Sequence, residues 1–224
     1  MIKSYYSNDI SDFTAEDNSS ILGKLNSAYN LENLNIKQTN AWEEQIEILK
    51  KNFTNFENGK IYFEFSIPRM GKRADNILVI NGLIFILEFK VGSKTYDNSS
   101  INQVLDYSLD LKNFHDGSHN MKIVPILIST KANSLDNEII INNDIYKPIK
   151  CNEDNLNTII TNILSLSTST TIDTLKWESS NYKPTPTIIE AAQALYRNHN
   201  VEDITRYEAG DNLAVTTTKH SSCR

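Results

Sequence analysis

The sequence predicts an α/β sandwich built around a mixed β-sheet. Three observations favour this fold class: a strongly amphipathic helix, two strand-like runs joined by an Asn-Gly turn, and an apolar run that follows a second helix. The order helix, three strands, helix, strand is typical of helices packed against a sheet with parallel and antiparallel pairs. The 224 residues suffice for one substantial domain with its own core.

The first predicted helix covers residues 40–53, because Trp42, Ile46 and Leu49 recur at helical spacing. Residues 1–39 are polar and weakly periodic, so we assign them to a separate N-terminal segment. The elements expected after the helix are strands at Ile61–Ile67, Asp75–Ile80 and Leu83–Phe89, a helix at Ser99–Phe114 and a strand at Ile123–Ile128. Pro125 predicts a sheet edge or a bulge for the last strand.

The pattern changes after residue 150. We expect a helix at Asn155–Leu166, a Ser/Thr linker at 165–171 and a helix at Thr187–His199. The chain is therefore divided into a polar segment (1–39), a core (40–150), a helix with a linker (151–183) and the start of a further domain (184–224).

Composition and charge restrict the class of protein. Hydrophobic residues make up 39% and charged residues 22%, as in globular proteins. The net charge of −6 disfavours a protein that coats nucleic acid by overall attraction. Cys151 and Cys223 build neither a disulfide framework nor a CxxC metal site. The sequence shows no signal-peptide core and no apolar run of ~20 residues, so we expect a cytoplasmic protein without a membrane partner.

The Asn81-Gly82 turn predicts which side chains face one another. If these two residues form the turn, Ile80 pairs with Leu83 and Asp75 lies directly opposite Glu88. Opposed residues on one face of a sheet have Cβ atoms about 4.5–5.5 Å apart. Lys90 shares the face of Glu88 because side chains alternate along a strand, and Arg73 would be the cross-strand partner of Lys90.

This arrangement suits a hard divalent cation and an anionic substrate. Two carboxylates with open positions favour Mg²⁺ or Mn²⁺ over zinc, which prefers His and Cys. A lysine beside such an ion can orient water or stabilise charge on a phosphate oxygen. Residues 60–95 hold six basic and three acidic side chains, a net charge of +3, and Arg69, Lys72 and Arg73 are candidates for binding nucleic acid.

The ordered features resemble the PD-(D/E)XK nuclease superfamily, specifically its RecB-like branch. They are Asp75, the Glu88-Phe89-Lys90 tripeptide after a hairpin, and Gln103-x-x-x-Tyr107 in the following helix. Longer blocks resemble the N-terminal portion of Schlafen group 3-like DNA/RNA helicase proteins, over nearly all of residues 35–217: AWEEQIEILK, IYFEFSIPRMGKRAD, FILEFKVG, QVLDYSLDLKNFH and PTPTIIEAAQALYRNH. In that family a nuclease-like domain precedes an ATP-driven motor.

The resemblance implies a restriction-endonuclease-like three-layer sandwich with a C-terminal helical extension. It also implies that Asp75 and Glu88 bind Mg²⁺ or Mn²⁺, with the backbone carbonyl of Phe89 as a further ligand. Lys90 would orient the attacking water, and Gln103 and Tyr107 would line the site. The implied activity is metal-dependent hydrolysis of nucleic acid, DNA rather than RNA, in phage defence or DNA repair.

Two further expectations come from the resemblance. Many superfamily members add a glutamate from the first helix, where Glu43, Glu44 and Glu47 are available, and we select Glu44. The family's motor needs a Walker A loop, and this sequence contains no G-x-x-x-x-G-K-[ST]. We therefore expect a chain cut before that loop, without ATPase activity and without its helicase partner.

Several residues have a second interpretation. Asp75 and Glu88 could be a solvated strand-end pair balanced by Arg73 and Lys90. Gln103 could close a capping box with Ser100, with Tyr107 in the core. His115 and His119 have a zinc-like spacing of four, but they more simply finish the helix.

At the level of the whole chain, two alternatives to a nuclease remain. One is an inactive module of the same fold that binds nucleic acid or docks on the motor. The other is a remnant whose C-terminal helix lacks its partner.

Overall fold

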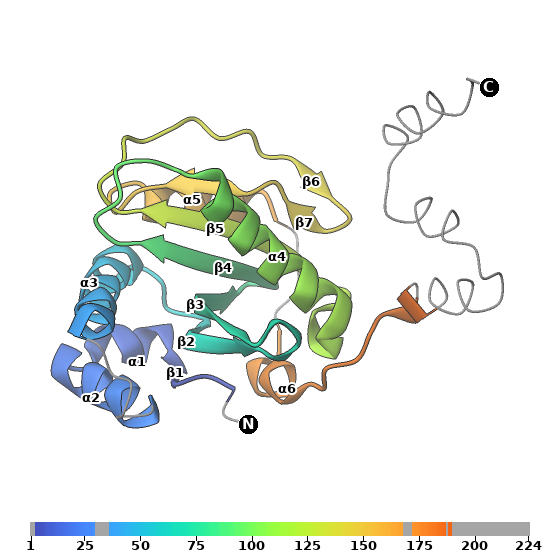
Figure 1. Cartoon of the computed structure of the whole chain (residues 1–224), viewed down its shortest axis with the longest axis horizontal. Coiled ribbons are helices and arrows are strands. Elements are labelled where there is room, and N and C mark those ends of the chain that lie inside the picture. Colours follow the sequence, from blue (N-terminus) through green and yellow to red (C-terminus); the bar gives the residue numbers. More distant parts are fainter. Residues whose placement is uncertain (1–2, 30–35, 168–171, 187, 190–224) are drawn as a thin grey trace, which may run out of the picture. The chain divides into compact units, whose positions relative to one another are not determined.

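The computed structural model describes residues 3–29, 36–167, 172–186 and 188–189 (Figure 1). The chain divides into two units, residues 1–182 and 183–224, and every element given below belongs to the first. The helices are α1 (Ile10–Ala15), α2 (Asn18–Ala28), α3 (Ile36–Phe53), α4 (Asn98–Phe114), α5 (Leu156–Ser165) and α6 (Thr174–Ser179). The strands are β1 (Tyr6–Asp9), β2 (Lys60–Ile67), β3 (Lys72–Ile80), β4 (Leu83–Lys90), β5 (Lys122–Ser129), β6 (Ile141–Asn142), β7 (Ile145–Tyr146) and β8 (Ile149–Cys151).

These strands form one mixed sheet in the order β1-β2-β3-β4-β5-β7-β6, with β8 also paired to β5. The pairs from β1 to β4 are antiparallel, whereas β5 runs parallel to β4, β7 and β8. Helix α4 connects β4 to β5, as a parallel pair requires. The predicted α/β class with a mixed sheet is confirmed.

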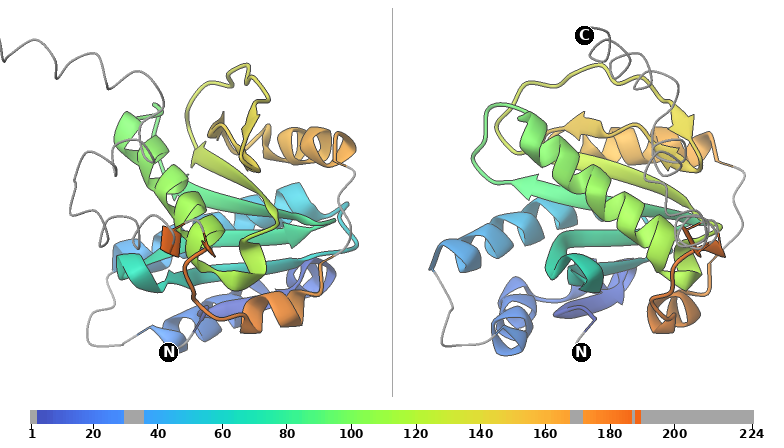
Figure 2. Two further views of the ribbon diagram at one scale, coloured as in Figure 1. Left: turned by 90° about the vertical axis from the view of Figure 1, so that its right-hand side faces the viewer. Right: turned by 45° about the vertical axis from the view of Figure 1, so that its right-hand side comes forward.

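Helices cover both faces of the sheet (Figures 1 and 2). On one face α1, α2, α3 and α5 pack against strand residues that include Phe63, Leu78 and Phe85. On the other face α4 and α6 pack against strand residues that include Ile77 and Ile84. Because both faces are covered, β4 and β5 are apolar along most of their length.

Most of the core elements match the prediction within a few residues. The first helix begins earlier than expected, at Ile36, and buries Trp42 completely. The strand predicted at Asp75–Ile80 begins at Lys72, because β3 continues along β2 beyond the point where it leaves β4. The predicted helix at Thr187–His199 lies almost entirely outside the described residues.

The segment assigned to residues 1–39 contains β1, α1 and α2, which share the core of the larger unit. Ile10, Phe13, Ile21 and Leu25 are fully buried against this core. Sequence patterning missed these elements because β1 and α1 are short and because the few apolar residues of α2 lie among Asn, Ser and Gly. The N-terminal segment is therefore part of the unit that carries the candidate site.

Of the two expectations for Pro125, the sheet edge is wrong, whereas the pairing beside it is irregular as a bulge implies, since Ile123 and Ile126 are three residues apart and their partners Ile145 and Ile149 are four apart. Strand β5 lies inside the sheet, with β4 on one side and β7 and β8 on the other. Pro125 lies between the residues that pair with these two short strands, Ile123 with Ile145 and Ile126 with Ile149. Proline has no backbone N–H, and it is tolerated at position 125 because this residue pairs with neither β7 nor β8.

None of the helices in the described part of the chain is long and apolar enough to cross a membrane.

Candidate functional site

The β3–β4 hairpin has the predicted register. Its pairs run from Ile80 with Leu83 to Asn76 with Leu87. Asn81 and Gly82 have positive φ values of 45° and 80°, as a two-residue turn of this kind requires. The ladder ends at Asn76, one residue before Asp75 would pair with Glu88.

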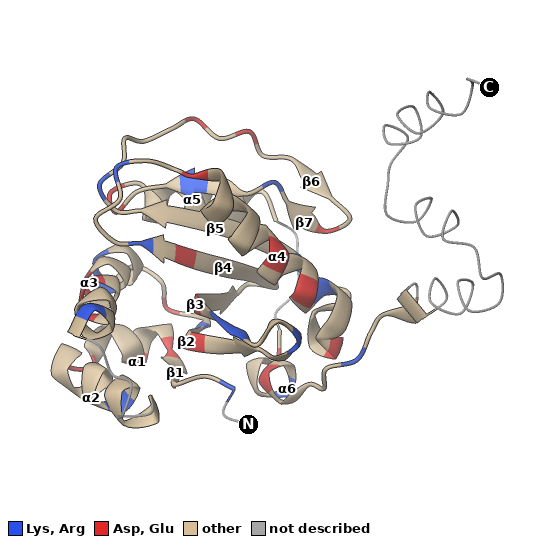
Figure 3. Cartoon of the chain, viewed as in Figure 1, with Lys and Arg blue, Asp and Glu red and all other residues tan. Residues whose placement is uncertain are grey.

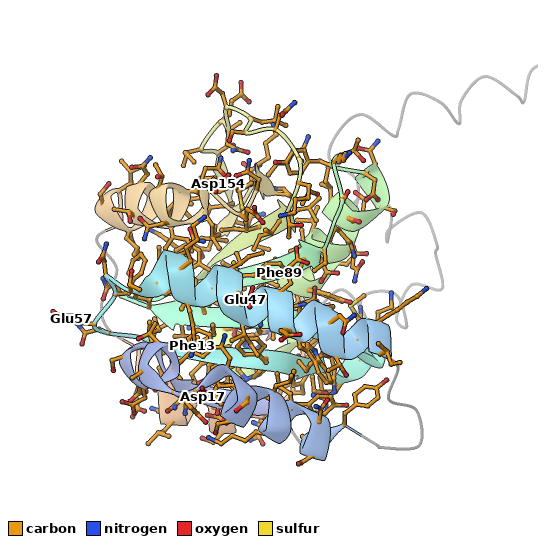
Figure 4. All side chains as sticks on the ribbon, turned by 90° about the vertical axis from the view of Figure 1, so that its left-hand side faces the viewer. Phe13, Asp17, Glu47, Glu57, Phe89 and Asp154 are labelled. Carbon is orange, nitrogen blue, oxygen red and sulfur yellow. The ribbon has the colours of Figure 1, made fainter. Side chains whose placement is uncertain are left out.

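Beyond the end of the β3–β4 ladder, the side chain of Asp75 takes the place of a backbone hydrogen-bond acceptor for β4. Its Oδ2 accepts a hydrogen bond from the backbone N–H of Phe89 at 2.8 Å. This bond places the Asp75 carboxylate beside the last residues of β4. The Phe89 side chain packs into the core on the α3 side, as Figure 4 shows. The neighbouring residues Glu88 and Lys90 point to the opposite face, where α4 lies.

Glu88, Lys90, Gln103 and Tyr107 form a continuous hydrogen-bonded chain between β4 and α4. The ammonium of Lys90 donates to Glu88 Oε1 at 2.8 Å and to Gln103 Oε1 at 3.2 Å. Gln103 Nε2 donates to the hydroxyl oxygen of Tyr107 at 2.9 Å. With Asp75 these four residues are called the β4 site. In Figure 3 an acidic and then a basic band mark the end of β4.

The capping-box interpretation of Gln103 is wrong. Asp97 is the N-cap of α4, and its carboxylate accepts the N–H of Ser100 at 2.9 Å. Because Asp97 already caps the helix, the amide of Gln103 is available to bind Lys90 and Tyr107 one turn further along.

The electrostatics of the β4 site disfavour two ionised carboxylates. Glu88 is 2% exposed, and its pKa is raised by burial and by the nearby Asp75, against the opposing effect of Lys90. Burial also raises the pKa of Asp75, which the Phe89 N–H and Lys90 partly offset. Like charges that lie close together repel, and most strongly where little water screens them. The site therefore favours a bound cation or a shared proton.

Glu64 on β2 is a further acidic residue near this site, and the sequence reasoning did not select it. The β2–β3 ladder pairs Phe63 with Asn76 and Phe65 with Ala74, so Glu64 lies opposite Asp75. Trp42 Nε1 donates to Glu64 Oε1 at 2.9 Å. The four-residue turn Pro68–Gly71 is the signal that could have found it, because centring the hairpin there gives this register.

Burial and the nearby Asp75 raise the pKa of Glu64 to about 7. The backbone at Glu64 is also unusual, since its φ of 53° is in the left-handed region. The usual alternation of side chains fails there, and Tyr62 and Phe65 pack on the same face of the sheet. Such strain in a strand is typical of functional sites.

Glu44, the selected first-helix glutamate, lines a surface cavity of about 490 Å³. The lining residues of that cavity in the described chain include no member of the β4 site: Asn40, Glu43, Glu44, Glu47, Ile48, Lys51, Lys131 and Glu153. Oε1 of Glu44 is buried and has no hydrogen-bond partner among the described residues.

The basic residues predicted to bind nucleic acid do not form one cluster. Arg69 donates to Asp110 at 2.9 Å and stacks 4.2 Å from the ring centre of Phe114, both on α4. Arg73 donates to the main-chain carbonyl of Glu64 and lies 4.0 Å from the ring centre of Tyr5. Lys72 is exposed.

Arg73 also lacks the predicted pairing with Lys90, because it pairs with Ser66 on β2 where β3 has left β4. Arg69 and Lys72 are the exposed members of the trio, and Arg73 is half-buried.

Of the two histidines expected to finish α4, His115 does so, whereas His119 follows the short 3-10 helix Asp116–Ser118. His115 is the C-cap residue and is 1% exposed. Its Nδ1 lies 2.8 Å from Ser118 Oγ. His119 is 3.8 Å from Asp116.

The donor set of the β4 site fits a hard divalent cation, because it offers two carboxylates beside a main-chain carbonyl. Oε2 of Glu88 is buried and has no hydrogen-bond partner in the described part of the chain, which leaves one ligand atom ready for an ion. No group of three or more His, Cys, Asp or Glu side chains within the described ranges is already arranged to hold a metal ion. Carbonyl or water oxygens would therefore complete the coordination of a cation at this site.

No family model, curated protein or solved structure matches this chain. The case for a function therefore lies in the geometry of the β4 site.

Proposed function

We propose that this chain is a Mg²⁺- or Mn²⁺-dependent nuclease module with a restriction-endonuclease-like sandwich. One observation carries the proposal: three elements, β3, β4 and α4, contribute polar side chains at the point where β4 leaves β3. These are Asp75, Glu88, Lys90, Gln103 and Tyr107, and hydrogen bonds join the last four. Lysine next to paired carboxylates on diverging strands suits phosphodiester hydrolysis, in which an ion, a water and a phosphate must be held together.

Each residue has a proposed role that follows from its contacts. Asp75, Glu88 and the Phe89 carbonyl would hold the ion, which when bound supplies positive charge to the scissile phosphate. Lys90 would orient the attacking water through an ammonium proton that it now donates to Glu88. Gln103 holds Lys90 in place and is itself held by Tyr107.

The substrate we propose is nucleic acid, and DNA rather than RNA. Exposed Lys72 and the exposed side chain of Arg69 provide positive charge near the turn between β2 and β3. As part of this proposal the module works beside an ATP-driven motor on a larger nuclease–helicase protein, in phage defence or DNA repair.

The test is cleavage of end-labelled single-stranded DNA, duplex DNA and RNA with Mg²⁺ or Mn²⁺. Asp75→Asn and Lys90→Ala should each abolish cleavage while the circular dichroism spectrum is unchanged. Lys131→Ala, a lysine outside the β4 site, is the matched control and should cleave normally. Retained cleavage in both site variants refutes the proposed mechanism.

The second candidate is a catalytically inactive module that binds nucleic acid or docks on the motor. It is favoured by the ion pair between Lys90 and Glu88, which balances the Glu88 charge without a metal. This candidate predicts salt-sensitive binding of nucleic acid with neither cleavage nor any effect of Mg²⁺ on thermal stability.

A further inference from the structure

We propose that Glu64 is the third acidic residue of the cation site, where it positions a water ligand of the ion. This inference rests on the proposed function. The register places Glu64 of β2 opposite Asp75 of β3, which in turn lies beside the end of β4 at Glu88. Three neighbouring strands thus carry one carboxylate each in a single row across the sheet, called here the acidic row.

Helix α3 holds the Glu64 carboxylate at one of its two oxygens. Trp42 Nε1 and Gln38 Nε2 both donate to Oε1, at 2.9 and 3.1 Å. Both bonds from the described residues of α3 go to Oε1, and the nearby charge of Arg73 also acts on this carboxylate. Glu64 is 9% exposed, and its main-chain carbonyl accepts from Arg73, so both the side chain and the backbone are fixed. A side chain held in this way can orient a ligand without further ordering.

The carboxylates of the acidic row interact electrostatically. Asp75 raises the pKa of Glu64, and both Asp75 and Glu64 raise the pKa of Glu88. An independent observation indicates a missing partner: Glu88 is 2% exposed, yet its Oε2 has no hydrogen-bond partner among the described residues. Buried carboxylate oxygens are normally satisfied, so a hydrated cation explains this oxygen and the row together.

No three His, Cys, Asp or Glu side chains in the described chain are positioned to hold one metal ion together. We therefore propose that Glu64 binds a water ligand of the ion and not the ion itself. Outer residues of this kind typically change metal affinity 10- to 100-fold.

Glu44 serves as a matched comparison on the helix that holds Glu64. It lines the surface cavity that also contains Lys51 and Lys131, and neither Asp75 nor Glu88 lines that cavity in the described chain. In our proposal α3 therefore supports the site through Trp42 and Gln38, and does not supply its own glutamate.

The experiment measures Mn²⁺ affinity by calorimetry and metal-free thermal stability for the full chain. The variants are Glu64→Gln, which removes the charge and keeps the shape, Glu64→Asp, which keeps the charge, and Glu44→Gln as the control. We expect Glu64→Gln to weaken Mn²⁺ binding at least tenfold without lowering the metal-free melting temperature. Glu64→Asp should retain more affinity than Glu64→Gln, and Glu44→Gln should bind as the wild type does.

The outcomes separate this inference from the proposed function. If the wild type binds Mn²⁺ and Glu64→Gln binds it equally well, Glu64 has no role at the ion and the nuclease proposal stands. If Glu44→Gln alone weakens binding, the helix glutamate is the third acid. If the wild type does not bind Mn²⁺, the proposed function itself fails. Should Glu64→Gln not fold, unchanged Mn²⁺ affinity in Glu64→Asp overturns the inference.

Discussion

The two ends of α4 contact two different buried polar regions. Near its N-terminal half, Gln103 binds Lys90, which binds Glu88. At its C-terminal end, His115 packs against Trp177, whose Nε1 donates to Ser118. Both regions contain buried atoms without a hydrogen-bond partner in the described chain: Oε2 of Glu88 in the first, and Nε2 of His115 and the hydroxyl of the adjacent Tyr182 in the second.

The regions differ in charge. Glu88 lies near the carboxylates of Asp75 and Glu64 and is paired with Lys90. His115 is surrounded by aromatic rings, and burial lowers its pKa to about 4, so it is neutral at neutral pH. The unpartnered oxygen of Glu88 therefore lies near negative charges that a cation would balance, whereas Lys3 and His119 near His115 are positive groups that lower its pKa further.

The largest expected effect is on activity at the acidic end. Glu88→Gln should reduce Mg²⁺-dependent cleavage by about 10³-fold, roughly 4 kcal/mol, because the ion loses a charged ligand. At pH 8 the same variant should unfold no more easily than the wild type, since a buried charge beside Asp75 is removed. Single-turnover cleavage and urea unfolding measure the two effects. Normal cleavage by Glu88→Gln would contradict the proposed role of Glu88 as a ligand of the ion.

The next effect is the pH dependence at the aromatic end. In the unfolded chain His115 becomes protonated below about pH 6.5, whereas in the folded chain its pKa is about 4. The contribution of His115 to stability is therefore complete above pH 6.5 and falls by about 3 kcal/mol as the pH drops to 4. The difference in unfolding free energy between the wild type and His115→Gln, measured from pH 4 to 8, isolates this effect. A flat difference curve would show that His115 titrates normally.

The third effect is stabilisation by the ion. Mn²⁺ at 100 times its dissociation constant should stabilise the wild type by about 2.7 kcal/mol. For a unit of this size that raises the melting temperature by roughly 5 to 10 °C. Differential scanning fluorimetry should show the increase in the wild type and in His115→Gln, but not in Glu88→Gln. An equal increase in Glu88→Gln would place the ion elsewhere.

The smallest effect concerns the charged cavity on α3. Lys131 pairs with Glu153 at 2.9 Å, and the two side chains are 50% and 26% exposed. Exposed pairs contribute under about 1 kcal/mol, so Lys131→Ala should change stability by less than that and leave cleavage unchanged. A large loss of cleavage in this variant would indicate that the active site lies in the cavity and not at the end of β4.

The parts of the molecule that local chemistry dictates were predictable from the sequence. Asn81-Gly82 permits one tight turn, and the observed register follows from it. The place of Gln103 at the site was expected only from the family resemblance, and its bond to Lys90 was not expected, because helix–strand packing depends on tertiary structure.

The rest depended on contacts that local patterns do not encode. Strand β1 and helix α1 are too short to show clear periodicity, and α2 has few apolar residues among Asn, Ser and Gly, so the folding of all three depends on burial against β2 and α3. Glu64 was not selected because its neighbour across the sheet depends on the second hairpin, whose longer turn gives a weaker register signal.

The bond between the Asp75 carboxylate and the Phe89 amide links chemistry to the shape of the hairpin. The same oxygen joins two separating strands and, in the proposed site, would also bind the ion. If a bound ion displaced the Asp75 oxygen from the Phe89 amide, that amide would lose its hydrogen-bond acceptor. Ion binding and the opening of the strand ends would then be coupled equilibria. Amide hydrogen exchange at Phe89 would then report occupancy from the protein side, before any substrate is added.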